Sequence, residues 1–311
     1  VIASIVKPKD IVPTSMKFVD IAGLVSGASR GEGLGNKFLA NIREMDALAH
    51  IVRCFQDPNV VHVEGKVDPV ADVEILNTEL ALADLDRVEK EICRVSKLSK
   101  GGDQTANAIT ELCERLIPHL NNAKPARSLP VSFEEKNLLK TLNLLTFKPT
   151  LYIANVDENL VIEKNEIGAL KKHLQEENSS VLVLCNRIES EISELDPEDI
   201  KEFLNELGLQ EPGLNVLIRE GYKLLNLQTF FTAGPKEVRA WTIRAGSSAP
   251  EAAACIHTDF QKGFIRAEVI SYEDYIYLNG EQGAKEAGMK RIEGKDYIVK
   301  EGDIIHFRFN I

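Results

Sequence analysis

A carboxylate and a glycine three residues apart are the first residues in the chain that could do chemistry. Asp20 and Gly23 lie at the end of an apolar run that predicts a short buried strand over 16–22. In many nucleotide hydrolases such an aspartate holds Mg²⁺ through water, and the glycine N–H approaches the γ-phosphate because no side chain intervenes. The alternative is an aspartate that caps a turn. Asp20 is therefore a candidate Mg²⁺ ligand and Gly23 a candidate catalytic residue.

The segment after Gly23 is rich in glycine, which is typical of a loop that changes conformation. A loop that is ordered by a phosphate and released when the phosphate leaves needs residues with a flexible backbone. We predict a switch loop here, and an ordinary glycine-rich turn is the alternative. Its residues are Leu24, Gly27, Gly31, Gly33 and Gly35. Leu24 stands where Ras-like proteins have a water-orienting glutamine, so hydrolysis must be slow or use another group.

A second polar loop follows a later apolar run and could bind a nucleotide base. It reads Asn-Val-Asp-Glu from Asn155 to Glu158, at the carboxyl end of a predicted strand. The guanine-reading version of this loop is Asn-Lys-x-Asp, so Val156 replaces the lysine and Glu158 the aspartate. Both changes should weaken discrimination in favour of guanine. Cys185 and Asn186 occupy the position of a further base-contacting loop. A polar strand-end loop is the alternative.

These loops need parallel strands to position them, and the spacing of the apolar runs predicts such strands. Short buried strands are predicted over 16–22 and 49–55, with a helix over 36–48 between them. Strand, helix and strand at this spacing form a βαβ unit with parallel strands. Apolar runs over 145–158 and 179–189 continue the pattern. The predicted fold class is therefore α/β.

Two helical runs interrupt this pattern. Apolar residues recur every three or four positions in both runs, and the segment 100–103 with two glycines joins them. We predict an inserted α-helical coiled-coil hairpin over 68–145, and two helices that only cover the sheet are the alternative. The apolar positions are Leu85, Val88, Ile92 and Val95, then Ile109, Leu112, Leu116 and Leu120.

A third pattern begins near residue 226 and predicts a small mixed domain. Strands are expected over 237–243 and 264–270, a helix near Ser248, and a closing hairpin over 296–309. The predicted domains are an α/β domain that carries the candidate nucleotide-binding loops (1–67 and 146–225), the inserted hairpin (68–145) and a C-terminal domain (226–311).

Composition limits the classes of function. The 311 residues carry 37 Lys and Arg against 48 Asp and Glu, a net charge of −11, so the average field would not attract nucleic acid. No apolar run approaches the about 20 residues of a membrane span. The five cysteines are scattered without a CxxC pair, which argues against disulfides or zinc and favours a reducing cytoplasm.

Any RNA contact must therefore come from a local basic patch. The candidate patch is Lys285, Lys290, Arg291 and Lys295, with acidic residues between them. It would bind phosphates by charge. A solvated surface is the alternative.

Longer stretches are shared with a known family. DIAGLVSGASRGEGLGNKFLANIRE, the NVDE loop, HTDFQKGFIRAEVI and GAKEAGMKRIEGKDYIVKEGDIIHFRFNI closely resemble the YchF family of Obg-related P-loop ATPases, and the resemblance covers essentially the whole chain. It implies a P-loop NTPase fold, namely an Obg-type G domain with the inserted hairpin and a C-terminal TGS domain of β-grasp type. It also implies a cytoplasmic protein that hydrolyses ATP in preference to GTP. The expected cofactor is Mg²⁺, with K⁺ as a second candidate cation. The expected partners are the ribosome, through its large subunit, and ribosomal RNA, without membrane or DNA.

The chain departs from that family in one motif. No G-x-x-x-x-G-K-[ST] occurs in the 311 residues, although the family carries this P-loop near its N-terminus. The motif supplies phosphate-binding amides, a lysine and a Mg²⁺-binding hydroxyl. The chain also begins without Met or a signal-peptide pattern. We expect a chain that lacks the N-terminal part of its G domain and is inactive by itself.

The resemblance points to His62 as the catalytic residue that takes the place of the glutamine. An imidazole can orient or deprotonate water near neutral pH. The alternative is a packed histidine, because Val60, Val61 and Val63 surround it in sequence. Two other functions stay open for the whole protein: a non-catalytic ribosome- or RNA-binding factor with a vestigial nucleotide site, and a guanine-specific GTPase.

Overall fold

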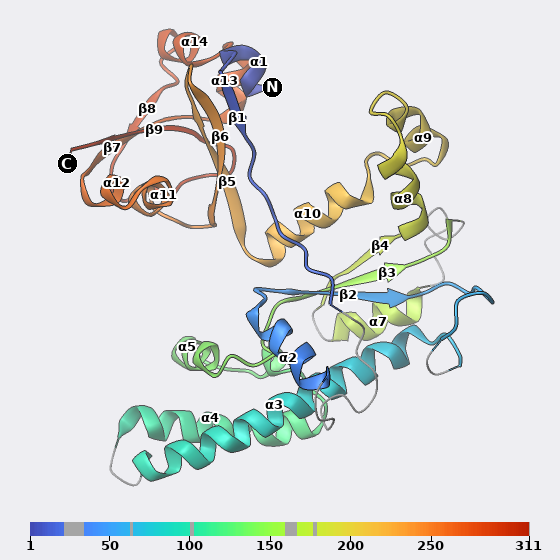
Figure 1. Ribbon diagram of the computed structural model, residues 1–311. Coiled ribbons are helices and arrows are strands. Elements are labelled where there is room, and N and C mark those ends of the chain that lie inside the picture. The colour runs from blue at the N-terminus through green and yellow to red at the C-terminus, as the bar shows by residue number, and fades with distance from the viewer. Residues whose placement is uncertain (22–33, 63–64, 100–102, 159–166, 177–178, 311) are drawn as a thin grey trace. The chain divides into compact units, whose positions relative to one another are not determined.

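The computed structural model of the chain is shown in Figure 1. It describes residues 1–21, 34–62, 65–99, 103–158, 167–176 and 179–310. The chain divides into two compact units. Unit 1 contains Val1–Phe18 and Gly221–Ile311, and unit 2 contains Val19–Glu220.

Three parallel strands form the sheet of unit 2. In spatial order they are β2 (Leu48–Arg53), β3 (Thr150–Asn155) and β4 (Val181–Leu184). The central strand β3 is buried from Leu151 to Ala154, as expected for a parallel strand that is covered on both faces. Helix α7 (Gly168–Glu176) packs Leu170 and Leu174 against this sheet. The three strands run in the same direction, so their carboxyl ends meet at one edge (Figure 1).

The predicted helical hairpin is present in unit 2. Its helices are α3 (Pro69–Ser99) and α4 (Gln104–Asn121), followed by the short helix η1 (Ala126–Ser128) and α5 (Phe133–Leu142). Asp103 caps α4 by accepting the Ala106 N–H at 3.0 Å. Val88, Leu112 and Leu116 are fully buried between the helices, so the apolar spacing was read correctly. Among the described helices, none is both long and apolar enough to cross a membrane.

The start of α3 packs on the sheet, and its middle packs on α2 (Leu34–Glu44). Val73 is fully buried beside β2 and β3, and Leu80 contacts the α2 residues Leu39 and Ile42 in one apolar cluster. The hairpin is therefore part of unit 2 and not a separate body. Three further helices complete the unit and lead out of it, namely α8 (Asn186–Glu194), α9 (Ile200–Glu206) and α10 (Gly213–Leu224).

The strand predicted over 16–22 is wrong in its described part. Residues 13–21 form neither helix nor strand, and Phe18 and Val19 are 47% and 43% exposed. An extended segment becomes a strand only when its N–H and C=O groups pair with a neighbour. In the described residues no strand pairs with this segment, and β2 is bonded only to β3.

A mixed six-stranded sheet forms unit 1, in the order β1-β6-β5-β9-β7-β8. The strands are β1 (Asp10–Val12), β5 (Leu227–Ala233), β6 (Glu237–Arg244), β7 (Phe264–Ile270), β8 (Arg291–Glu293) and β9 (Ile304–Phe309). Adjacent residues of β9 face opposite sides of the sheet, so Ile305 and Ile304 belong to two different apolar cores, one on each face. Ile305 packs with α11 (Ala249–Ile256), and Ile304 packs with α1 (Ile2–Val6) and α13 (Tyr272–Tyr277). The small helices α12 (Thr258–Lys262) and α14 (Glu281–Glu286) complete the unit.

Two sequence predictions differ from this unit. Residues 1–18 lie in unit 1 and not with the predicted G-domain segment 1–67, because β1 pairs in parallel with β6. The predicted closing hairpin over 296–309 is also wrong, since β9 pairs with β5 and β7 instead. The segment before β9 is a turn in which the Asp303 carboxylate accepts the Tyr297 hydroxyl and the Lys300 N–H. Gly302 in this turn has a φ of 80°, which favours glycine.

Glu268 on β7 should make the stability of unit 1 sensitive to acid. Hydrogen bonds from Arg308 and then Lys290 lower the pKa of this carboxyl from 4.5 to about 2. Its contribution to the unfolding free energy is therefore complete above pH 4.5 and is lost as the pH falls toward 2. We expect this contribution to the unfolding free energy to be about 2 kcal/mol, since the Arg308 side chain is half-exposed and water screens part of the interaction.

The fluorescence of Trp241, the single tryptophan of the chain, reports the unfolding of unit 1 by urea. Between pH 7 and pH 2.5 the wild type should lose more stability than Glu268→Gln, which already lacks this contribution at pH 7. Glu273→Gln removes an exposed carboxylate of the same unit and should behave like the wild type. An equal loss in Glu268→Gln and the wild type would contradict the assignment.

Candidate functional site

The candidate site lies where the parallel strands of unit 2 end. The Asn155 Oδ1 accepts the Asn186 N–H at 3.0 Å, and the Val156 N–H donates to the Leu184 carbonyl at 2.9 Å. These bonds join the loop after β3 to the loop after β4. The structure therefore brings together the two loops that were predicted to contact a nucleotide base.

Within the first loop, Val156 and Glu158 differ in their surroundings. Val156 is 3% exposed and packs in the apolar cluster of the sheet, so its side chain is part of the core. The Glu158 carboxylate is partly exposed and pairs with the Arg187 guanidinium at 3.0 Å. Arg187 also approaches Glu191 at 3.4 Å. A base that binds here must exchange with, or bind beside, this guanidinium.

The loop after β4 contributes backbone groups to the site. Cys185 is buried and packs with Ile188 and Ile192, so its role is in the core. Glu189 accepts the N–H groups of Gly213 and Leu214 at 2.8 and 3.0 Å, which caps the start of α10. The Asn186 N–H is held by Asn155, as described above. The sequence prediction named Cys185 and Asn186 together, and the structure gives them different surroundings: Cys185 is packed in the core, and the Asn186 N–H bonds to Asn155.

The loop after β2 is organised by an arginine. Arg53 donates three hydrogen bonds to carbonyl groups, from Nε to Phe55 at 3.1 Å, from Nη1 to Val60 at 2.9 Å and from Nη2 to Asp57 at 3.2 Å. Its guanidinium also lies over the Phe55 ring, 4.7 Å from the ring centroid. One side chain thus fixes the backbone that leads to His62. Sequence reasoning missed Arg53, because no spacing distinguishes an arginine at a strand end.

His62 contacts the first turn of α3. Its Nε2 lies 3.1 Å from the Asp72 Oδ2, and its side chain is 14% exposed. Val60 and Val61 are 45% and 90% exposed, so these neighbours in sequence do not pack around the imidazole. The packed alternative is therefore not supported by these valines. His62 makes a polar contact to a helix.

Asp72 also lies close to the end of β2. Burial raises the pKa of the Cys54 thiol to about 11, and the negative charge of Asp72 contributes to that shift. Cys54 directly follows β2, and its N–H donates to the Asn155 carbonyl at 2.8 Å. Asp72 therefore lies close both to His62 and to the residue that follows β2. Sequence reasoning missed Asp72, which reads as an ordinary acidic residue in a first helical turn.

The candidate Mg²⁺ ligand Asp20 is exposed and follows the irregular segment. Mg²⁺ usually keeps several waters and uses one or two carboxylates together with phosphate oxygens. A single accessible carboxylate fits that mode. No cluster of three or more His, Cys, Asp or Glu side chains in the described part of the chain could bind a metal without a substrate.

The switch loop can be placed only in part. Gly35 lies in the first turn of α2. Gly23, Leu24, Gly27, Gly31 and Gly33 lie outside the described residues.

The residues of the candidate RNA patch in unit 1 differ in their exposure and in their ion pairs. Lys290 is 17% exposed and pairs with Glu268 at 2.7 Å and Glu281 at 2.8 Å, so its charge is used within the unit. Lys285 and Lys295 are exposed. Two of the four predicted residues, Lys285 and Lys295, thus present their side chains to solvent.

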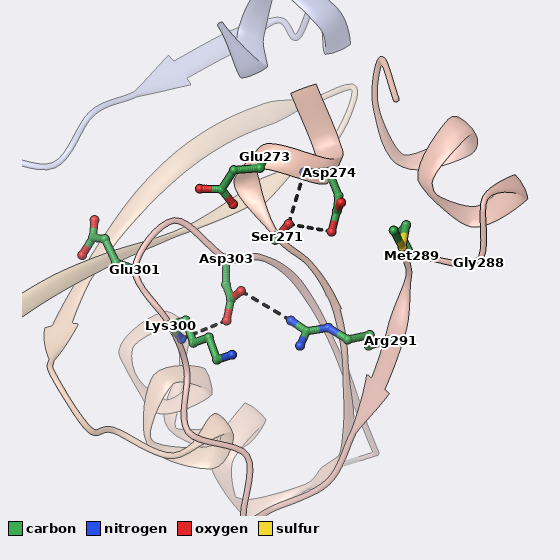
Figure 2. A pocket seen from close by; sticks show the side chains of 9 residues that line it. All are labelled: Ser271, Glu273, Asp274, Gly288, Met289, Arg291, Lys300, Glu301 and Asp303. Carbon is green, nitrogen blue, oxygen red and sulfur yellow. Dashed lines mark hydrogen bonds and ion pairs between the residues drawn. The ribbon is translucent and has the colours of Figure 1, made fainter. Parts of the chain in front are cut away.

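Arg291, the fourth residue of that patch, lines a cavity of about 480 Å³ (Figure 2). Its guanidinium points toward Asp303, 3.8 Å away, and lies over the Tyr297 ring. Two cationic and four acidic side chains line the cavity: Arg291, Lys300, Glu273, Asp274, Glu301 and Asp303. This excess of negative charge does not favour a phosphate ligand.

Comparison with known proteins gives matches over the whole chain. A family model of the YchF GTPase C-terminal domain, described as a protein of unknown function, matches residues 227–310. The chain is 58% identical to a protein of Haemophilus influenzae named ribosome-binding ATPase YchF, over 310 residues that span 100% of this chain and 85% of the relative. A Bacillus subtilis protein of the same name is 52% identical over 313 residues, with 100% and 86% covered.

A solved structure agrees with these matches. The YchF GTPase of Schizosaccharomyces pombe superposes with a TM-score of 0.87 at 34% identity, over 99% of this chain and 84% of that one. Both units therefore have counterparts in a known structure.

Proposed function

The chain belongs to the YchF family, with its P-loop NTPase fold, and on that premise we propose that it is a ribosome-associated nucleotide hydrolase that prefers ATP to GTP and acts as a nucleotide-dependent switch. The observation that carries the proposal is the Asn155–Asn186 hydrogen bond, which joins the two loops predicted to contact a base, at the carboxyl edge of a parallel sheet. His62, Gly23 and the glycine-rich loop are its proposed catalytic and switch elements.

The preference for ATP follows from the residues of the first loop. Guanine is usually read by an aspartate that accepts hydrogen bonds from its N1–H and 2-amino groups. Here the longer Glu158 is paired with Arg187, so guanine would compete with a guanidinium for that carboxylate. Val156 is in the core and offers no lysine. Adenine lacks those two donors, so its binding free energy does not depend on a free carboxylate at this position.

Asp20 is proposed to hold Mg²⁺, and the bound ion would neutralise charge on the phosphates. K⁺ is a second candidate cation. The 311 residues contain no P-loop motif, so we propose that this chain by itself does not hydrolyse ATP. The part of the Haemophilus influenzae relative outside the 310-residue match can be joined to these residues in its aligned place, and we propose that this part supplies the P-loop. We call this protein the completed chain.

Equilibrium binding of non-hydrolysable ATP and GTP analogues with Mg²⁺ tests the nucleotide assignment. The completed chain should bind the ATP analogue about tenfold more tightly, a difference of about 1.4 kcal/mol. The 311-residue chain should bind neither. Glu158→Asp restores the guanine-reading aspartate at a partly exposed position and should shift the ratio toward GTP. Tighter GTP binding by the unaltered completed chain would instead support the guanine-specific GTPase.

The proposed partner is the ribosome, through its large subunit and ribosomal RNA, which places the protein in the cytoplasm. Residues 226–311 are proposed as the TGS domain, and its exposed Lys285 and Lys295, rather than the paired Lys290, as the RNA contacts. Replacing both exposed lysines by glutamate should weaken co-sedimentation with ribosomes and leave nucleotide binding unchanged. If the completed chain co-sediments but binds neither nucleotide, the non-catalytic RNA-binding factor takes the place of the hydrolase.

A further inference from the structure

We propose that Asp72 is a positioning residue for His62: it fixes the tautomer and the direction of the imidazole that acts on the attacking water. The inference rests on the proposed function, since His62 meets that water only in a protein that hydrolyses nucleotide. Asp72 itself would touch neither the nucleotide nor the water.

The contact between the two side chains determines which imidazole nitrogen is basic. The Asp72 Oδ2 lies 3.1 Å from the His62 Nε2, and the side chains are 22% and 14% exposed. A carboxylate can only accept a hydrogen bond, so the neutral imidazole carries its proton on Nε2. Nδ1 is then the nitrogen with the basic lone pair. An imidazole in the other tautomer would present a donor where a proton acceptor is needed.

Asp72 is held by a rigid element. It lies in the first turn of α3, and its N–H donates to the Asp68 carbonyl at 2.9 Å. The next residue, Val73, is fully buried against the sheet. A negative charge near the start of a helix is also stabilised by the helix dipole. The carboxylate is therefore anchored by a helix of 31 residues, and the imidazole that it contacts lies on a loop.

The described backbone beside His62 has hydrogen bonds that do not involve Asp72. Arg53 binds three carbonyls on the N-terminal side of His62, and the Gly65 N–H donates to the His62 carbonyl at 3.0 Å. Gly65 has a φ of 72°, a conformation that other residues rarely adopt. Asp72 is thus not needed to hold the loop in place, and its separate contribution is the direction of the ring.

Kinetics of the completed chain separate a positioning role from a structural one. Asp72→Asn should lower kcat for ATP hydrolysis about tenfold and leave KM within about twofold. In the background of His62→Ala the same replacement should change kcat no further, because Asp72 acts only through His62. Glu74→Gln removes an exposed carboxylate two positions further along α3 and should have no effect. An unchanged kcat in Asp72→Asn, or an equal loss with and without His62, would overturn the proposal.

A second measurement needs no nucleotide. The ¹⁵N chemical shifts of the His62 ring in the 311-residue chain should show the Nε2–H tautomer, and Asp72→Asn should change the tautomer population while Glu74→Gln does not. Shifts that are the same in all three proteins would also overturn the inference. If the completed wild type hydrolyses no ATP while these shifts respond to Asp72→Asn, the proposed function fails and the ring orientation by Asp72 stands. The two failures can therefore be told apart.

Discussion

Replacing His62 by alanine should lower kcat for ATP hydrolysis by the completed chain about 100-fold, with the Kd for ATP within about twofold. A positioned general base or water-orienting group contributes a factor of this size. In the proposed site the imidazole is the only such group assigned, since Leu24 cannot accept a hydrogen bond from water. Binding should persist because Asn155 and Asn186, which join the two loops proposed to contact the base, are not altered.

Single-turnover hydrolysis of radiolabelled ATP measures this effect separately from product release. Val61→Ala is the matched control, since this residue lies on the same loop, precedes His62 and is 90% exposed. It should keep the wild-type rate. His62→Gln, which introduces the residue of Ras-like proteins, should recover part of the lost rate. A His62→Ala rate within threefold of the wild type would remove His62 from the catalytic assignment.

Replacing Asp84 by alanine should lower the unfolding free energy of unit 2 by about 3–5 kcal/mol. This carboxylate is 0% exposed and accepts three hydrogen bonds, from the Leu145 N–H at 2.8 Å, the Thr146 N–H at 2.7 Å and the Thr146 hydroxyl at 2.7 Å. Burial raises its pKa, while the bonds from Thr146 and Leu145 oppose that rise. Alanine would leave two backbone N–H groups buried without an acceptor, next to the segment that leads into β3.

Urea unfolding followed by circular dichroism at 222 nm gives the loss of stability in this helix-rich unit. Asp86→Ala is the matched control, because that residue lies two positions further on α3 in an exposed ion pair with Lys90, and it should cost less than 1 kcal/mol. Asp84→Asn keeps one acceptor oxygen and should fall between the two. The fluorescence of Trp241 should show unit 1 unchanged. A cost for Asp84→Ala no larger than that for Asp86→Ala would show that the buried bonds do not stabilise the unit.

Patterns that act over a few neighbouring residues could be predicted from the sequence. The apolar spacing in α3 and α4 predicted their packing, and the helix expected near Ser248 begins there, with Ser248 as its N-cap. The runs that became β3, β6 and β7 were also identified. In the site, the loops at Asn155 and Asn186 could be predicted because parallel strands place their carboxyl ends at one edge.

Features that depend on a distant partner could not be predicted in this way. The apolar segment 16–22 looked like a strand, but its described residues have no strand beside them to pair with. The first 18 residues belong to the same unit as the C-terminal residues because β1 pairs with β6. For the same reason β9 paired with β5 and β7 and not with the segment before it.

The polar contacts of the candidate site follow the same division. The sequence marks His62, Glu158 and Lys290 as residues that could do chemistry. It does not show that Asp72 accepts from His62, that Arg187 pairs with Glu158 or that Lys290 pairs with Glu268. A side-chain hydrogen bond or ion pair requires two groups within about 3–4 Å. That distance is set by the packing of helices and strands, so the partners of these residues are a property of the tertiary structure alone.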